Sequence, residues 1–267
     1  MKLKLGQADR WLMYDAEFEF AKMLAKKAGS IMLEYFSLDK QIKYKDDATP
    51  VTIADEKINR MVIEELSKKF DHEIIGEEES TTAYGKHDTV WICDPIDGTK
   101  AFIYGLPTSM FSLGLVHKGT PVLGVAYDPF LERMFYAKRG SGSYCNGRKL
   151  EVSKNGLKGH NVGMVSDARE LERIKPSLNK LFQKGANAVY IEGAVYKTCL
   201  VAEGKFVGYF SDLPKTHDMA AVAVILEEAG GKITASDGSE LDFSKFFEGA
   251  VVSNGKVHGE LLEILNS

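Results

Sequence analysis

An apolar run that ends in two aspartates constrains this fold more than any other stretch. Residues 90–93 (Val-Trp-Ile-Cys) lead directly into Asp94-Pro95-Ile96-Asp97-Gly98-Thr99. The β-branched and aromatic residues of the run predict a buried strand. The proline pushes the backbone of Asp94 to extended geometry, and Thr99 is expected to cap a short helix. Two carboxylates therefore stand at a strand end, which is where ligands bind in open α/β sheets.

Helical and strand-like patterns alternate along the rest of the chain. Apolar residues at helical spacing predict helices over 14–36, 52–70, 168–183, 195–202, 216–229 and 256–265. Strands are expected at 73–75, 110–116, 122–127, 133–137, 142–145, 162–165, 188–191, 206–210, 250–252 and near 233. The strands between 110 and 145 predict an antiparallel meander covering the sheet of the first half, and 39–50 a loop.

Composition narrows the class of partner. The net charge of −4 and the lack of a basic block argue against nucleic acid. No apolar run approaches the roughly 20 residues that span a bilayer, and the N-terminus lacks a signal-peptide core, so a cytoplasmic protein without membrane contact is expected. Cys93, Cys145 and Cys199 lie far apart, which predicts buried thiols rather than a disulfide framework or a zinc site.

Acidic residues stand at the ends of several predicted elements. They are Glu77, Asp94, Asp97 and Asp218. Each has an ordinary explanation, either a solvated loop or a charge on a helix dipole. If they converge, they cannot all ionise in a closed site without cations. Oxygen ligands alone select Mg²⁺ or Mn²⁺, and two such ions bridged by one carboxylate suit hydrolysis of a phosphate ester.

The sequence resembles the inositol monophosphatase family of Mg²⁺-dependent, lithium-sensitive phosphatases. The resemblance rests on Asp94–Thr99 and on matching elements in order: Val51-Thr52 with Asp55, Gly76-Glu77-Glu78, Asn146-Gly147, His217-Asp218-Met219-Ala220-Ala221 and Glu228-Ala229-Gly230-Gly231. It covers roughly residues 15 to 265, and the joint occurrence is highly specific. It implies an α/β fold, a layered αβαβα sandwich of the sugar-phosphatase type. The two sheet-containing halves would be 1–150, with most metal ligands, and 151–267, with Asp218 and the substrate-selecting segment. Family members are often homodimers.

The resemblance also implies a role for each site residue. The first metal would be held by Glu77, Asp94 and the carbonyl of Ile96, and the second by Asp94, Asp97 and Asp218. Glu77 would help a weaker third ion through water. Catalysis would use Asp55, Glu77 and Thr99, with Asp55 orienting Thr99 to position or deprotonate the attacking water. Substrate would be bound by Asp97, Gly98, Thr99, Ala194, Asp212 and Asp218.

The implied reaction is hydrolysis of a small phosphorylated metabolite by activated water, without a phosphoenzyme. Inositol monophosphate is the first choice. Fructose 1,6-bisphosphate, histidinol phosphate and 3′-phosphoadenosine 5′-phosphate are the alternatives within the family. A catalytically silent regulator that binds a partner protein is the alternative from a different class. It is disfavoured because every implied ligand position holds a suitable residue.

Two departures from the family pattern concern the substrate side. His217 stands where relatives often have tryptophan, and we expect it to fill the same space. Before it, the chain offers Ser211, Asp212 and Lys215, where inositol phosphatases often carry a glutamate that touches substrate hydroxyls. Asp212 is the candidate for that role. Lys215 either favours a second phosphate or is an ordinary loop charge, which is the preferred interpretation.

Overall fold

The computed structural model describes residues 14–36, 42–44, 50–164 and 168–266. Its helices are α1 (Asp15–Phe36), α2 (Ile53–Ser67), α3 (Thr99–Ile103), α4 (Ala168–Gln183), α5 (Ala194–Ala202), α6 (Thr216–Glu228) and α7 (His258–Leu265). Its strands up to residue 149 are β1 (Ile42–Tyr44), β2 (Pro50–Thr52), β3 (Glu73–Gly76), β4 (Thr89–Asp97), β5 (Met110–His117), β6 (Thr120–Asp128), β7 (Arg133–Lys138), β8 (Ser143–Cys145) and β9 (Arg148–Lys149). The later strands are β10 (Asn161–Met164), β11 (Asn187–Tyr190), β12 (Gly208–Lys215), β13 (Lys232–Thr234) and β14 (Glu248–Ser253).

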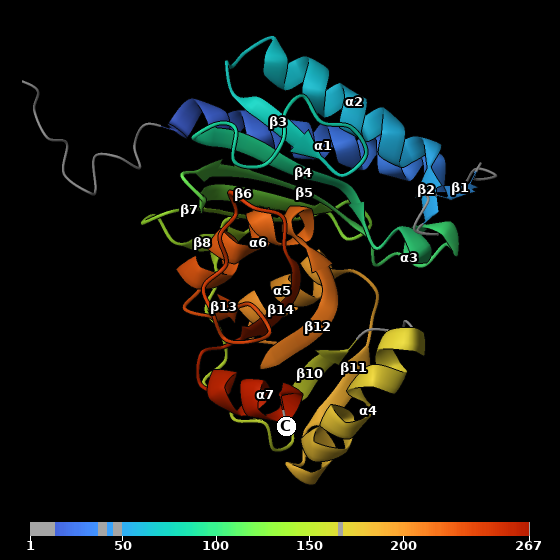
Figure 1. Cartoon of the computed structure of the whole chain (residues 1–267). Helices are drawn as coiled ribbons and strands as arrows, with labels where there is room; N and C mark the ends of the chain where they lie inside the picture. The colour runs from blue at the N-terminus through green and yellow to red at the C-terminus, as the bar shows by residue number, and fades with distance from the viewer. Residues whose placement is uncertain (1–13, 37–41, 45–49, 165–167, 267) are drawn as a thin grey trace, which may run out of the picture.

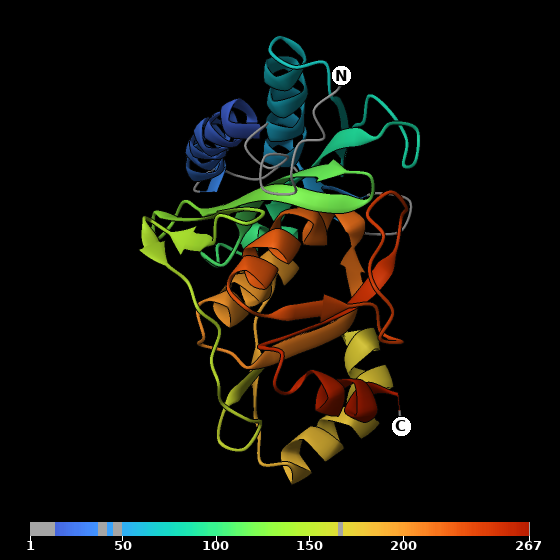
Figure 2. The same cartoon turned by 90° about the vertical axis from the view of Figure 1, so that its left-hand side faces the viewer.

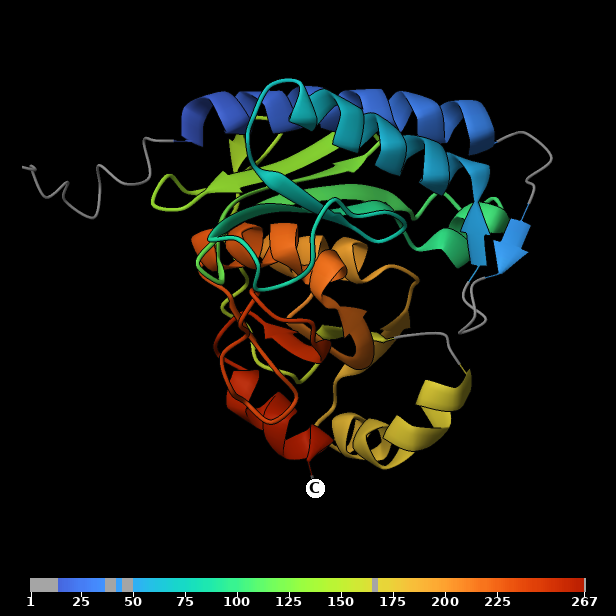
Figure 3. The ribbon, with the colours of Figure 1, turned by 45° about the horizontal axis from the view of Figure 1, so that its top comes forward.

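The elements stack in five layers, as the αβαβα prediction requires (Figure 1). Helices α1 and α2 run beside each other over the outer face of a seven-stranded sheet (Figure 3). Helices α5 and α6 fill the space between this sheet and a five-stranded one, whose outer face is covered by α4 and α7 (Figure 2). Three apolar cores hold the layers together: one under α1 and α2, one around α5 and α6 that reaches both sheets, and one under α4 and α7, so the fold class predicted from the sequence is confirmed.

The first sheet has the order β3-β4-β5-β6-β7-β8-β9. Strand β3 pairs parallel to β4, and every later pair is antiparallel. The meander expected between 110 and 145 is therefore wrong in one respect. Its strands do not cover another sheet but extend the sheet that contains β4, because β5 pairs directly with it.

The second sheet has the order β11-β10-β12-β14-β13. Strand β12 runs through Lys215, whereas the sequence predicted a strand that stops at residue 210. The strand is longer because it pairs with β14 as far as Glu248, with a register shift between Ser211 and Lys215. The segment preceding Asp218 is thus part of a sheet rather than a loop.

Helix α6 lies directly on the seven-stranded sheet because small residues face each other there. A Cβ atom on Gly114 of β5 would lie 2.8 Å from the backbone nitrogen of Ala221. The small alanine side chains of α6 also allow the helix to lie this close to the sheet. The approach places the first turn of α6, with Asp218, beside the end of β4.

The structure also bears on several smaller expectations from the sequence. Part of the 39–50 loop forms a two-stranded antiparallel sheet of β1 and β2, while 39–41 and 45–49 lie outside the described residues. Helix α4 contains Pro176 as predicted. The three cysteines are buried and free. No described helix is long and apolar enough to cross a membrane. The first sheet ends at Lys149 and the second begins at Asn161, and a division into folding units near residue 150 stays a prediction.

Candidate active site

The end of β4 lies beside the end of β3. Their parallel register pairs Gly76 with Cys93, and the amide of Glu77 donates to the Cys93 carbonyl at 3.1 Å. Strand β4 continues beyond the predicted end through Asp97, with a register shift against β5 between Asp94 and Asp97. This irregularity carries both aspartates to the same edge of the sheet as Glu77.

Asp218 reaches this edge from the first turn of α6. Its Oδ2 accepts a hydrogen bond from the backbone nitrogen of Lys215 at 2.6 Å, which fixes the carboxylate at the helix start. One carboxylate oxygen from each of Asp94, Asp97 and Asp218 lies within 4.8 Å of the others. The convergence that the metal hypothesis assumed is therefore present for these three residues.

The protein compensates the charge of this acidic cluster only in part. Asp94 is 1% exposed, and its Oδ1 has no hydrogen-bond partner among the described residues. Burial raises the pKa of Asp94 well above its usual range, and repulsion from Glu77 and Asp218 raises it further. Burial likewise raises the pKa of Asp97, with Asp218 adding to the effect. A set of oxygen donors in this state fits a hard divalent cation, which would offset the buried charge.

Glu77 and His217 lie next to the acidic cluster. The Nε2 atom of His217 is 3.6 Å from Oδ1 of Asp218 and 3.9 Å from Oε1 of Glu77. The imidazole thus stands between two of the predicted metal ligands. The third predicted ligand atom of the first metal, the carbonyl of Ile96, accepts a hydrogen bond from the Thr99 hydroxyl at 3.1 Å.

The expected capping role of Thr99 is wrong. The N-cap of α3 is Gly98, whose φ of 82° is a left-handed conformation that favours glycine, and Thr99 is the first helical residue. The hydroxyl turns back to Ile96 instead, because the sharp bend at Gly98 brings that carbonyl close.

Asp55 is a buried carboxylate at the start of α2. Thr52 is the N-cap of α2 and forms a capping box with Asp55. The Oδ2 atom of Asp55 accepts from the backbone nitrogen of Thr52 at 2.8 Å and from its hydroxyl at 2.5 Å. The other oxygen, Oδ1, has no hydrogen-bond partner among the described residues. Burial raises the pKa of Asp55 to about 7. No hydrogen bond joins Asp55 to Thr99 in the described part of the chain, so that pairing stays a prediction.

The first turn of α5 holds Asp97 from the other side. Oδ1 of Asp97 accepts from the amide of Ala194 at 2.7 Å, and Oδ2 accepts from the amide of Tyr196 at 3.2 Å. Gly193, the N-cap of α5, has a φ of 86°, and a Cβ atom there would lie 2.5 Å from Oδ2 of Asp97. Ala194 was expected near the site from the resemblance alone, whereas this backbone contact with Asp97 was missed.

A pocket opens between the acidic cluster and the second sheet. Around the cluster it is lined by Glu77, Asp97, Gly98, Thr99, Lys100 and Asp218. The other lining residues come from α5, the two residues before it and β12: Glu192, Gly193, Ala194, Lys197, Tyr209, Ser211, Leu213 and Pro214. Ser211, from the segment that precedes Asp218, is therefore in the pocket. The Asp212 side chain lies outside the described residues. Lys215 does not line this pocket, and its backbone instead holds Asp218.

Lys197 is a pocket residue that the sequence motifs did not indicate. It is 2% exposed, although it is a lysine in an apolar helix. Its Nζ donates to the carbonyl of Ile191 at 2.9 Å and lies 4.8 Å from the centre of the Tyr209 ring. Its positive charge lowers the pKa of Asp97 and so partly opposes the effect of burial. A charged residue on a helix face that is otherwise apolar was the available indication.

Comparisons with known proteins identify the family and the fold. The model of the inositol monophosphatase family matches residues 13–267. A "Fructose-1,6-bisphosphatase/inositol-1-monophosphatase" of Thermotoga maritima is 32% identical over 93% of this chain and 95% of its own. The solved Thermotoga maritima IMPase superimposes with a TM-score of 0.86 at 28% identity, covering 94% of this chain and 97% of that one. An IMPase/NADP phosphatase solved with Mg²⁺ and phosphate has a TM-score of 0.82 at 25% identity, with 93% and 95% covered.

Proposed function

Because this chain belongs to the inositol monophosphatase family and is one of its phosphomonoesterases, we propose that it hydrolyses a small polyol or sugar phosphate, with inositol monophosphate as the first choice. The observation that carries the proposal is the convergence of Asp94, Asp97 and Asp218, of which Asp97 and Asp218 line a pocket. A phosphate bound there would bring its negative charge to the place where cations are needed. The pocket beside it has room for the leaving group.

Mg²⁺ is the proposed cofactor, since a relative of this fold was solved with Mg²⁺ and phosphate and the donors here are all oxygens. Glu77, Asp94 and the Ile96 carbonyl would hold one ion, and Asp94, Asp97 and Asp218 a second. A third, weaker ion would sit near Glu77, and Mn²⁺ would substitute. The bound ions supply positive charge to the phosphate and lower the pKa of a water molecule.

The protein groups around the ions do the positioning. We propose that the Thr99 hydroxyl orients the attacking water and that the unpaired Oδ1 of Asp55 accepts a proton or a hydrogen bond along this path. The backbone amides of Gly98 and Thr99 would bind phosphate oxygens. Water then attacks phosphorus directly, the bond from phosphorus to the leaving oxygen breaks, and no phosphoenzyme forms.

The substrate is tested with a panel of phosphate esters. Phosphate release in the presence of Mg²⁺ is measured for inositol monophosphate, fructose 1,6-bisphosphate, histidinol phosphate and 3′-phosphoadenosine 5′-phosphate. We expect the highest kcat/KM for inositol monophosphate. Much faster turnover of 3′-phosphoadenosine 5′-phosphate would make the first choice wrong, and no turnover of any ester would favour a silent regulator.

Fructose 1,6-bisphosphate is the second candidate because two lysines line the pocket. Lys197 and Lys100 bring positive charge to the pocket wall, and Ser211 stands in the segment where inositol phosphatases often carry a substrate-binding glutamate, although Glu192 also lines the pocket. Lys197→Met should lower kcat/KM for the bisphosphate by roughly 10-fold or more, because a hydrogen bond to a charged group contributes about 1.5–3 kcal/mol. Lys215→Met is the matched control, since this lysine lies outside the pocket wall. Equal losses for monophosphate and bisphosphate would remove this candidate.

The remaining family properties are part of the same proposal. We expect inhibition by millimolar Li⁺, a homodimer in solution and a cytoplasmic location. Complete insensitivity to tens of millimolar Li⁺ would contradict the expected lithium inhibition. A monomeric mass by light scattering would contradict the expected homodimer.

A further inference from the structure

The Asp97 carboxylate depends on where α5 lies. Both of its oxygens accept hydrogen bonds from amides in the first turn of this helix, those of Ala194 and Tyr196. The helix belongs to the second half of the chain, whereas Asp97 belongs to the first. Any contact that fixes α5 against the first half therefore also fixes Asp97.

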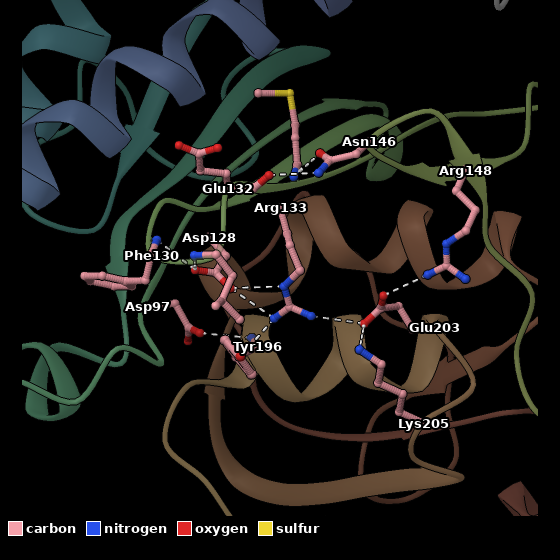
Figure 4. A network of polar contacts seen from close by, with 12 residues as sticks. Asp97, Asp128, Phe130, Glu132, Arg133, Asn146, Arg148, Tyr196, Glu203 and Lys205 are labelled. Atoms are coloured by element: carbon pink, nitrogen blue, oxygen red, sulfur yellow. Dashed lines mark hydrogen bonds and ion pairs between the residues drawn. The ribbon is translucent and has the colours of Figure 1, made fainter.

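Arg133 makes such a contact (Figure 4). It is the first residue of β7 in the seven-stranded sheet, and its side chain is only 16% exposed. Its Nη2 donates to the hydroxyl of Tyr196 at 2.8 Å, and its Nη1 donates to Oε2 of Glu203 at 3.2 Å. Tyr196 lies in the first turn of α5 and Glu203 is its C-cap, so one guanidinium holds both ends of the helix.

The guanidinium is itself held rigidly. Oδ2 of Asp128 accepts from both Nε and Nη2 of Arg133, at 3.2 and 3.0 Å. Oδ1 of Asp128 accepts from the amides of Phe130 and Leu131 in the turn between β6 and β7, and the Asp128 side chain is fully buried. A carboxylate with these bonds has no freedom to rotate, and neither has the planar fork that it binds.

We propose that Arg133, acting through Tyr196, is a positioning residue for Asp97. Tyr196 joins the two contacts: its hydroxyl accepts from Arg133, and its backbone nitrogen donates to Asp97. The arginine thereby sets where the first turn of α5 presents its amides to the carboxylate. The inference rests on the proposed function, in which Asp97 is a ligand of the second Mg²⁺.

Tyr196→Phe tests the proposal because it removes one hydroxyl and keeps the ring. Mg²⁺ affinity is measured by calorimetry on the protein without substrate, and by the Mg²⁺ concentration that gives half-maximal phosphate release. We expect Mg²⁺ affinity to fall by roughly 10-fold, the lower end of what the loss of an outer-shell partner costs. At saturating Mg²⁺ the kcat should return to within about 2-fold of the original value, since the ligands themselves are unchanged.

Arg148→Met is the matched control. Arg148 also binds Glu203, at 3.0 Å from the other oxygen, but its side chain is 68% exposed and the Tyr196 contact is made by Arg133. Its loss should leave Mg²⁺ affinity unchanged. Arg133→Lys is the second test variant, which keeps a cation beside the buried carboxylates but cannot make the same fork. It should weaken Mg²⁺ binding in the same direction as Tyr196→Phe.

The results separate this proposal from the proposed function. If the unaltered protein binds Mg²⁺ and hydrolyses a phosphate ester while Tyr196→Phe matches it in Mg²⁺ affinity, the positioning role is wrong and only a structural tie remains. A lower thermal midpoint of Tyr196→Phe with unchanged Mg²⁺ affinity would likewise mean that the contact only stabilises the fold. If the unaltered protein neither binds Mg²⁺ nor hydrolyses any ester of the panel, both proposals fail.

Discussion

The two sides of the pocket are built in different ways. The acidic side consists of Glu77, Asp97 and Asp218, with Asp94 buried beside them, and backbone pairing and a helix start bring all four to one sheet edge. The far side consists of Lys197, Tyr209, Ser211 and Leu213, of which the first comes from α5 and the others from β12. The acidic side is fixed by the backbone and the far side by the packing of side chains. We therefore expect chemistry to depend on the first and substrate choice on the second.

The largest expected effect comes from changing the acidic side at its centre. Asp94→Asn keeps the shape of the side chain and removes its charge. We expect phosphate release to fall by more than about 100-fold, because this carboxylate would bridge two ions. Mg²⁺ binding measured by calorimetry should weaken in parallel, while the circular dichroism spectrum stays the same.

Asp88→Asn is the matched control for this change. Asp88 is an exposed acid just before β4 that pairs with Lys118 on the surface. Its loss should alter activity by less than about 2-fold, since exposed ion pairs contribute little. Retention of full activity by Asp94→Asn would contradict the two-metal mechanism and remove the distinction between the two sides.

The second prediction concerns the point where the two sides meet. Gly193→Ala would place a methyl group 2.5 Å from Oδ2 of Asp97, on a backbone whose φ of 86° already disfavours any side chain. We expect a loss of activity of roughly 10- to 100-fold, as for other disturbed metal ligands, and a loss of about 1–3 kcal/mol in the free energy of unfolding.

Gly159→Ala separates strain from contact. Gly159 has a φ of 75°, and a Cβ atom there would have no neighbour within 4 Å. It should show a similar loss in the free energy of unfolding without a loss of Mg²⁺ affinity. If Gly193→Ala binds Mg²⁺ normally, the Asp97 carboxylate can shift freely, and the two sides are less tightly joined than their hydrogen bonds indicate.

The third prediction is a pH dependence that belongs to the acidic side. Burial raises the pKa of Asp94 and Asp97, and it raises the pKa of Asp55 to about 7. Between pH 4 and 7 the folded metal-free protein therefore holds protons that the unfolded chain has lost. Its free energy of unfolding should fall as the pH rises through this range, with Asp55 contributing up to roughly 4 kcal/mol.

Urea unfolding at pH 5, 6, 7 and 8, with EDTA or with Mg²⁺, measures this effect. Mg²⁺ should flatten the pH dependence because the cation replaces the protons as the source of positive charge. Asp94→Asn should reduce the slope in EDTA. A metal-free protein whose stability rises over this range would mean that these carboxylates ionise at ordinary pH and that the cluster is already neutralised by the protein.

The same contrast explains how much could be predicted from the sequence. Most elements followed from short motifs, and the layers and the ligand set from the family resemblance that those motifs carry. From the residues alone the convergence of the three aspartates was an assumption, although a strand end and a helix start each confine a side chain to a small region. The position of Lys197 in the pocket could not be predicted in this way, because it depends on how α5 packs. The extension of β12 through Lys215 could not be predicted from the local sequence either, since it depends on pairing with β14. Gly98 as the N-cap in place of Thr99 shows that local patterns leave single positions ambiguous.

The smallest expected effect lies at His217, where the sequence favoured simple filling of space. The ring is 3.6 Å from Oδ1 of Asp218 and 3.9 Å from Oε1 of Glu77, and both distances exceed that of a strong hydrogen bond. His217→Phe preserves the bulk and should change kcat/KM and Mg²⁺ affinity by less than about 3-fold, whereas His217→Ala should lower the free energy of unfolding by roughly 1–3 kcal/mol. If His217→Phe instead weakened Mg²⁺ binding by more than about 10-fold, the imidazole would be acting on the two carboxylates. His217 would then belong to the acidic side by chemistry as well as by position, because a phenyl ring reproduces its packing but not its nitrogen.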